Sequence, residues 1–408
     1  MTQTKTNPLF SWIVVLLFPL YSLPWVIYRV FQFEKVAFVQ FAFFMGLVGM
    51  LYPPSGDMYR YYQDFLLYKG LDWDTFLLLA TINFDYLLAL ISYFLGIVNI
   101  PFDISRFIYN FLGYYLLGKL YLQIRKDNPI LAEEHYKNKA FLVFFVISLS
   151  NFLFRSGLSN ILFLYGLYYI LYKNEKKYYI FVFLAVFNHF SFIIFAVLFL
   201  ISKFFTLKIH KPIQYVLFLF IFFASHFINA SILDYLPLPA AYMDHYATYF
   251  NGIQAGEITD RFSWKYMLWI NFGHYVTYLI LLLYISNNRH FNNRENSFIN
   301  MSFVLCVLSS PFFIMYDRFI TSLCFFLKVS YLLTLQKSFR YLKQISILFY
   351  LSIMLDLMNI YGNWRQISIS DMSILTYKTS FQILGHSYSD SWINNNITER
   401  GDIVKYAE

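Results

Sequence analysis

The chain has 408 residues, of which 59% are hydrophobic, 23% are aromatic and only 13% are charged. Soluble domains carry about 25% charged residues, so this composition excludes an ordinary soluble protein. The formal net charge is +8, and the basic residues gather in short segments between apolar runs. The preference of positive charge for the cytoplasmic side of a membrane explains this pattern better than nucleic acid does, so we expect no nucleic-acid partner.

Apolar runs of about 20 residues recur along the sequence, and a helix needs that length to cross a bilayer. We therefore predict an all-α polytopic membrane protein with about 12 transmembrane helices and one re-entrant or interfacial helix. The first run, 9–28, is too long for the apolar part of a signal peptide and lacks a small-x-small site, which indicates a first span. Residues 1–361 would form the membrane domain and 362–408 a polar C-terminal tail.

Taken in order, the next runs are a span at 36–52, a short re-entrant helix at 85–98 and a span at 104–124. Two long runs are interrupted by polar residues, 140–172 at Arg155 and 178–204 at Asn188 and His189. The remaining spans are expected at 213–233, 265–285, 298–315, 320–335 and from 344 to about 361.

The basic turns between the spans are expected to face the cytoplasm. Two longer loops, 53–82 and 234–264, then lie on the opposite side, together with nearly every polar group that interrupts an apolar run. This convergence predicts a functional site on the outer face of the membrane.

The stretch from Pro53 to Asp64 places carboxylates, a guanidinium and several phenols where an apolar run ends. Prolines and Gly56 end a helix there. Asp57 and Arg60 are three residues apart, so one helical turn puts them on one face. The pair suits a charged substrate at a membrane surface, although an exposed salt bridge would need no further role.

Three other polar groups interrupt apolar sequence, where charge is costly and often functional. Arg155 has no acid near it in sequence, so an anionic ligand or a distant carboxylate must satisfy it. His189 is either a hydrogen-bonded core residue or a base. Arg318 follows Asp317 and forms an ion pair or a phosphate clamp, because guanidinium groups bind phosphate oxygens in a bidentate way.

Other acidic and basic residues are weaker candidates. Asp72 and Asp74 resemble an acidic metal-binding pair, but a solvated loop explains them, and we predict no metal or other cofactor. His245 and Arg261 lie in the long loop 234–264 and are candidates for substrate contact. No Walker A, GxGxxG, HExxH or GxSxG motif occurs, so nucleotide-driven transport and hydrolase chemistry of those types have no support.

Four short motifs, in this order, resemble the Wzy/EpsG-type polysaccharide polymerase family. The first is Gly56-Asp57-Met58-Tyr59-Arg60-Tyr61, and the others are Phe154-Arg155-Ser156-Gly157-Leu158-Ser159, Phe187-Asn188-His189-Phe190-Ser191 and Tyr316-Asp317-Arg318-Phe319. The likeness extends over most of 1–361.

This resemblance implies a GT-C-like glycosyltransferase of the bacterial inner membrane with its active site on the periplasmic or outer face. The enzyme would transfer a glycan chain from undecaprenyl pyrophosphate to the non-reducing end of a new lipid-linked repeat unit of an O-antigen or capsule. Donor, acceptor and bilayer are the expected partners, with a chain-length regulator and a flippase as further candidates.

The residues fit that chemistry. Arg155, Arg318 and Arg60 would stabilise the pyrophosphate leaving group. Asp57 or His189 would accept the proton of the acceptor hydroxyl, and the sequence leaves this choice open. Tyr61, Asp317, His245 and Arg261 would contact substrate.

Three other functions remain as alternatives. An O-antigen ligase uses the same donor, and His245 in the long outer loop is compatible with it. A flippase for lipid-linked oligosaccharides would place charges on both faces and show an internal repeat, neither of which is evident. A membrane-bound acyltransferase with a cytoplasmic thioester donor would need a histidine on the other side of the membrane from His189.

Overall fold

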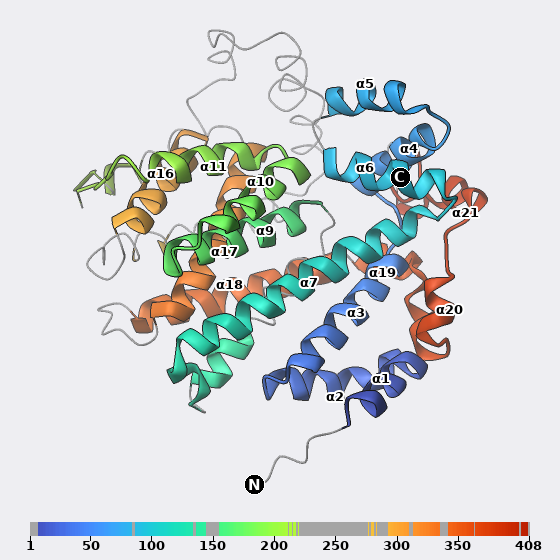
Figure 1. Ribbon diagram of the computed structural model, residues 1–408, viewed down its shortest axis with the longest axis horizontal. Helices are drawn as coiled ribbons and strands as arrows, with labels where there is room; N and C mark the ends of the chain where they lie inside the picture. The colour runs from blue at the N-terminus through green and yellow to red at the C-terminus, as the bar shows by residue number, and fades with distance from the viewer. Residues whose placement is uncertain are drawn as a thin grey trace. The chain divides into compact units, whose positions relative to one another are not determined.

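The computed structural model describes residues 7–83, 86–133, 136–143, 155–210, 293–309, 313–334, 342–362, 364–399 and 401–406, with a few isolated positions between 212 and 283. In these ranges every regular element is a helix, which confirms the all-α prediction (Figure 1). The extended residues Ile397 and Ile403 form a β-bridge. The chain divides into two compact units, 1–193 with 356–408, and 194–355.

The core of the first unit is the pairing of α3 (Lys35–Leu51) with the long helix α7 (Phe102–Asp127). Small residues let the two backbones approach. A Cβ on Gly49 would lie 3.2 Å from the carbonyl oxygen of Arg106, and one on Gly118 would lie 3.0 Å from Cδ1 of Phe38. On its other side α7 packs against α9 (Arg155–Tyr172), which in turn packs against α10 (Tyr179–Asn188).

The predicted first span, 9–28, is two helices, α1 (Pro8–Leu17) and α2 (Pro19–Phe31). Pro19 has no N–H to continue the ladder of α1, and Phe18 before it is not helical. Of the helices in the described ranges, none combines the length and the apolar character needed to cross a membrane.

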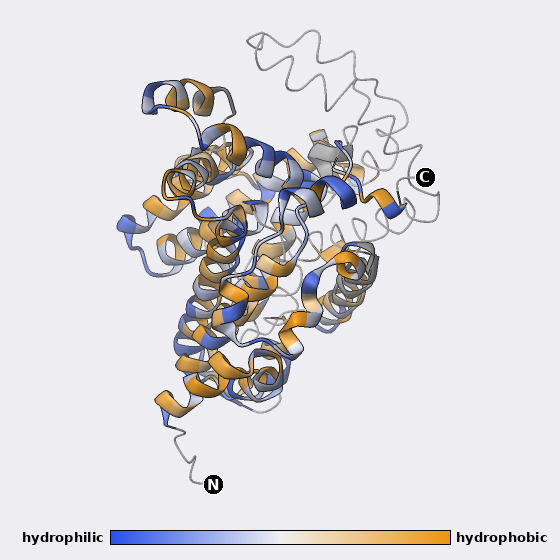
Figure 2. Ribbon diagram, turned by 90° about the vertical axis from the view of Figure 1, so that its right-hand side faces the viewer, coloured by the Kyte–Doolittle hydropathy of each residue, from blue (hydrophilic) through white to orange (hydrophobic). Residues whose placement is uncertain are grey.

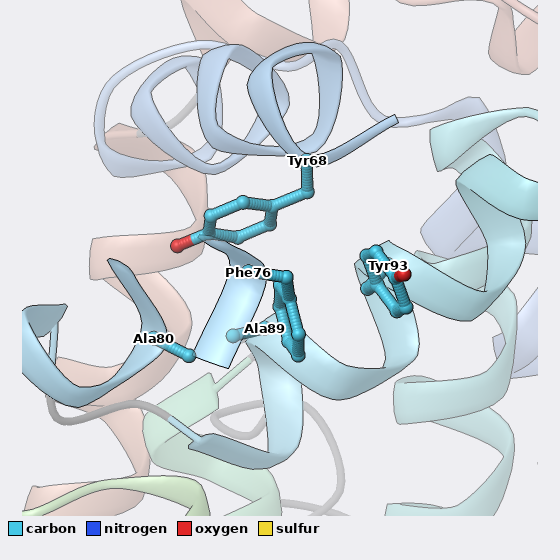
Figure 3. Packing of buried hydrophobic residues seen from close by; sticks show 5 residues of the cluster. All are labelled: Tyr68, Phe76, Ala80, Ala89 and Tyr93. Atoms are coloured by element: carbon cyan, nitrogen blue, oxygen red, sulfur yellow. The ribbon is translucent and has the colours of Figure 1, made fainter. Parts of the chain in front are cut away.

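The predicted outer loop 53–82 is also largely helical. It forms α4 (Asp57–Tyr68) and α5 (Trp73–Asn83), followed by α6 (Tyr86–Ile97) where the short re-entrant helix was expected. These helices share a small aromatic core, in which the rings of Phe76 and Tyr93 stack with 4.2 Å between centroids (Figure 3). Tyr68 of α4 joins this core, so the core holds the C-terminal end of α4.

The segment after residue 361, predicted to be a polar tail, folds into short helices and returns to the first unit. Ser380 donates a hydrogen bond to the carbonyl of Val15 in α1, 3.0 Å away. The helices after residue 341 are α18 (Leu342–Gly362), α19 (Trp364–Ile369), η5 (Asp371–Thr376), α20 (Ser380–Leu384), α21 (Asp390–Asn396) and η6 (Val404–Tyr406).

In the second unit, aromatic contacts join α11 (Phe192–Ile201), α16 (Asn293–Ser309) and α17 (Phe313–Thr334). The rings of Phe199 and Phe298 lie 5.7 Å apart edge to face. Tyr316 to Phe319 was expected between two spans, but α17 already includes it. Two short 3-10 turns in the first unit complete the described elements, η1 (Pro129–Ala132) and η2 (Lys176–Tyr178).

Hydrophobic residues are spread along most of the ribbon, with short hydrophilic stretches between them (Figure 2). Several large apolar side chains are exposed on α1 and α2 of the first unit, among them Leu9, Phe10 and Tyr21.

Candidate functional site

Helix α4 begins where the predicted break falls. Pro53 and Pro54 follow the end of α3, and Gly56 immediately before α4 has φ 61°, a conformation that glycine adopts without strain. Asp57 then occupies the first turn, where the positive end of the helix dipole favours a carboxylate. The sequence prediction of a helix break followed by a new helical turn is confirmed here.

One face of α4 is buried and an adjacent face is polar. The buried side chains are Tyr59, Tyr62, Phe65 and Tyr68. The polar residues Asp57, Arg60, Tyr61 and Asp64 follow the spacing i, i+3, i+4, i+7, so they form one stripe along the helix. We call these four residues the α4 stripe. Within it Asp57 and Arg60 form an exposed ion pair, as their spacing predicted.

Arg155 of α9 reaches this stripe. Its guanidinium carbon lies 5.0 Å from the centroid of the Tyr61 ring. Burial raises the pKa of the Tyr61 phenol, and the Arg155 cation opposes that rise. The neutral phenol and its electron-rich ring therefore face a guanidinium from another helix.

Asp64 also belongs to this site, although it is not among the candidates predicted from the sequence. Burial raises the pKa of its carboxyl group, while the Arg60 and Arg155 cations lower it. A carboxyl group with a raised pKa beside two guanidiniums is a better proton acceptor than an ordinary surface acid. Its spacing of four from Arg60 and three from Tyr61 was the signal that could have identified it.

Asn188 fixes the position of Arg155. Its side-chain amide donates to the Arg155 carbonyl at 2.9 Å and to Oγ of Ser159 at 2.7 Å. Its side-chain oxygen accepts a hydrogen bond from the Tyr109 hydroxyl at 2.8 Å. Asn188 is fully buried at the end of α10, and its hydrogen bonds join α10 to α7 and to the start of α9 at Arg155.

His189 occupies the break between α10 and α11 that the sequence predicted. Its ring is buried and lies 6.1 Å from the ring of Phe192. The Arg155 cation lowers the pKa of Asp64, which now joins Asp57 and His189 as a candidate base.

The remaining candidates belong to other parts of the chain. Arg318 is a half-buried residue of α17 in the second unit. The Asp72 carboxylate accepts hydrogen bonds from the N–H of Thr75 at 3.0 Å and from the Thr75 hydroxyl at 2.8 Å. Asp72 therefore caps α5. Among the described residues no cluster of three His, Cys, Asp or Glu side chains could hold a metal ion. The side chain of Asp317 and the residues His245 and Arg261 lie outside the described residues.

A model of the EpsG family matches residues 35–379. The chain belongs to the EpsG family. The match includes α4, Arg155 and Asn188, so the whole cluster around Arg155 lies within the family's region, and the predicted family is confirmed. Membership of the EpsG family indicates a function of the polysaccharide-polymerase type. Searches of curated proteins and of solved structures give no match.

Proposed function

We propose that this EpsG-family protein polymerises polysaccharide repeat units at the outer face of a bacterial inner membrane. The donor is a glycan chain on undecaprenyl pyrophosphate, and the acceptor is the non-reducing-end hydroxyl of a second lipid-linked unit. The observation that carries the proposal is the placement of Arg155 against Tyr61, with Asp64 on the same stripe. This arrangement puts a fixed cation and a proton acceptor side by side.

The chemistry uses both groups. The acceptor oxygen attacks the anomeric carbon of the donor, and the bond from that carbon to the pyrophosphate oxygen breaks. Arg155 of α9, together with Arg60 of the α4 stripe, stabilises the negative charge that develops on the leaving pyrophosphate. The hydroxyl proton passes to a carboxylate of α4, for which Asp64, whose pKa is raised by burial, is the first candidate and Asp57 the second.

A membrane location is supported by apolar side chains that remain in contact with the surroundings. Tyr21 and Leu9 are 69% exposed, and Phe183 is 58% exposed. Large apolar side chains that remain exposed suit contact with lipid or with other proteins. A lipid-linked substrate would reach the site from the membrane. We also propose a GT-C-like arrangement of the helices.

Polymerisation of a purified lipid-linked repeat unit by the protein in proteoliposomes tests this function. We expect a ladder of products from the wild type, and no ladder from Arg155→Ala. Arg125→Ala is the matched control. Arg125 also lies over an aromatic ring, that of Phe33 at 3.7 Å, but it is in the last turn of α7. An unchanged ladder from Arg155→Ala would refute the role of the cation.

A deletion in the native host separates the alternatives. Surface glycans that carry a single repeat unit would support a polymerase. Long lipid-linked chains that fail to reach the surface would indicate a ligase, and single units trapped on the cytoplasmic side would indicate a flippase.

A further inference from the structure

The last part of the chain, 380–406, lies beyond the region that the family model matches, yet it contacts α4 directly. Its first contact is between two backbones. The N–H of Gly56, the residue before α4, donates to the carbonyl of Gly401 at 2.7 Å. Gly401 has φ 85°, and a Cβ there would lie 2.8 Å from the Gly56 oxygen, so this approach requires glycine.

The second contact is between side chains. The hydroxyl of Tyr62, on the buried face of α4, donates a hydrogen bond to the carboxylate of Asp390 at the start of α21. Burial raises the pKa of Tyr62, and the Asp390 hydrogen bond adds to the rise, so the phenol remains the donor. Tyr62 is next to Tyr61, whose ring meets Arg155. In Figure 1 α21 lies beside α4.

The third contact anchors the segment itself. The hydroxyl of Tyr388 donates to the carbonyl of Leu51 at the end of α3, 2.6 Å away, and its N–H donates to Asp103 of α7 at 3.3 Å. The segment is therefore attached to the helices of the core and, through Gly401 and Asp390, to the first turns of α4.

We propose that residues 380–406 are a positioning element, in which Gly401 and Asp390 hold the first turns of α4 so that its stripe meets Arg155. The aromatic core around Tyr68 holds the other end of the helix. In the first turns, the Tyr62 ring also packs against Phe102 of α7. The effect on polymerisation rests on the proposed function. A displacement of about 1 Å in a catalytic arrangement can cost about 100-fold in rate, so these two attachments matter more for turnover than for folding.

Amide hydrogen exchange in the full-length protein tests the positioning without any assay of activity. Gly401→Ala and Asp390→Ala are expected to speed exchange in the first two turns of α4 while exchange in α3 and α7 stays as in the wild type. Gly385→Ala is the matched control, because a Cβ there would meet its nearest neighbour at an ordinary 3.7 Å. Asp390→Asn, which keeps an oxygen that accepts from Tyr62, should restore protection. Unchanged exchange in both test variants, or a loss of protection throughout the unit, would overturn the proposal.

Polymerisation kinetics in the same variants test the consequence. We expect Gly401→Ala and Asp390→Ala to lower kcat on the order of tenfold or more in protein that still folds. Tyr62→Phe should match Asp390→Ala, and the double variant should be no worse than either, because both remove one hydrogen bond. Full activity in these variants, alongside an inactive Arg155→Ala, would refute the positioning element and leave the proposed function intact. An active Arg155→Ala would refute the proposed function, and exchange would still decide the positioning.

Discussion

The guanidinium of Arg155 lies over the ring of Tyr61, 5.0 Å from its centroid. The two residues come from different helices, α9 and α4, and further hydrogen bonds fix the position of each helix. Asn188 fixes the backbone of Arg155, and the Gly56–Gly401 and Tyr62–Asp390 contacts fix the start of α4. Together these contacts fix the position of the Arg155 cation relative to the carboxylates of the α4 stripe.

Substitutions at Tyr61 separate the ring from its hydroxyl. Tyr61→Leu removes the cation–π contact, which is worth about 1–2 kcal/mol when partly desolvated, so kcat/KM should fall about tenfold. Tyr61→Phe keeps the ring and should retain most of the activity. Steady-state kinetics with the lipid-linked repeat unit measure both. Equal losses in the two variants would show that the hydroxyl matters and the ring does not.

Asp64 should govern the acidic side of the pH profile. A base must be deprotonated to work, and burial raises the pKa of Asp64, so kcat/KM should fall as the pH drops through that raised value. Asp64→Asn should lower kcat about 100-fold or more and remove this acidic limb. If kcat/KM still fell at low pH in Asp64→Asn but not in Asp57→Asn, Asp57 would be the base instead.

Local spacing was enough to predict part of the site. Prolines and Gly56 marked the helix break, and the spacing of Asp57 and Arg60 predicted their shared face. The polar pair Asn188–His189 marked the break between α10 and α11. Each of these features depends on interactions within one or two helical turns, which a sequence pattern records directly.

Long-range contacts could not be predicted in this way. Tyr62 and Asp390 are 328 positions apart, and neither residue has a local pattern that points to the other. The many Ser and Asn residues of 362–408 predict a polar tail, whereas the segment forms short helices that contact the core. The apolar composition of 9–28 predicts one span, but composition alone does not reveal that Pro19 lacks the N–H needed to continue a helix.

Asn188 should contribute strongly to stability. Asn188→Ala removes the partner of the Tyr109 hydroxyl, the Arg155 carbonyl and the Ser159 hydroxyl, and leaves polar groups without their bonds in a buried site. We expect a loss of about 2–4 kcal/mol in the free energy of unfolding and a lower thermal midpoint. Asn395→Ala, at an exposed position of α21, is the control. A stable but inactive Asn188→Ala would assign this residue a direct role in turnover.

Two Asp–Arg pairs with the same i, i+3 spacing allow a direct comparison of a buried and an exposed ion pair. The side chains of Asp103 and Arg106 in α7 are 7% and 1% exposed, whereas those of Asp57 and Arg60 are 59% and 55% exposed. Asp103→Ala leaves a buried guanidinium without its counter-ion and should cost about 3–5 kcal/mol in the free energy of unfolding. Asp57→Ala should cost less than about 1 kcal/mol.

Replacing both members of the buried pair should be milder than removing one of them. Asp103→Leu with Arg106→Met leaves no unpaired charge, so its loss of stability should be smaller than that of Asp103→Ala. Tyr388 would still lose the acceptor of its N–H, so the double variant should loosen the C-terminal segment. Thermal unfolding followed by intrinsic fluorescence ranks the variants. A double variant as unstable as Asp103→Ala would contradict this ranking, because removing the uncompensated charge of Arg106 would then restore no stability.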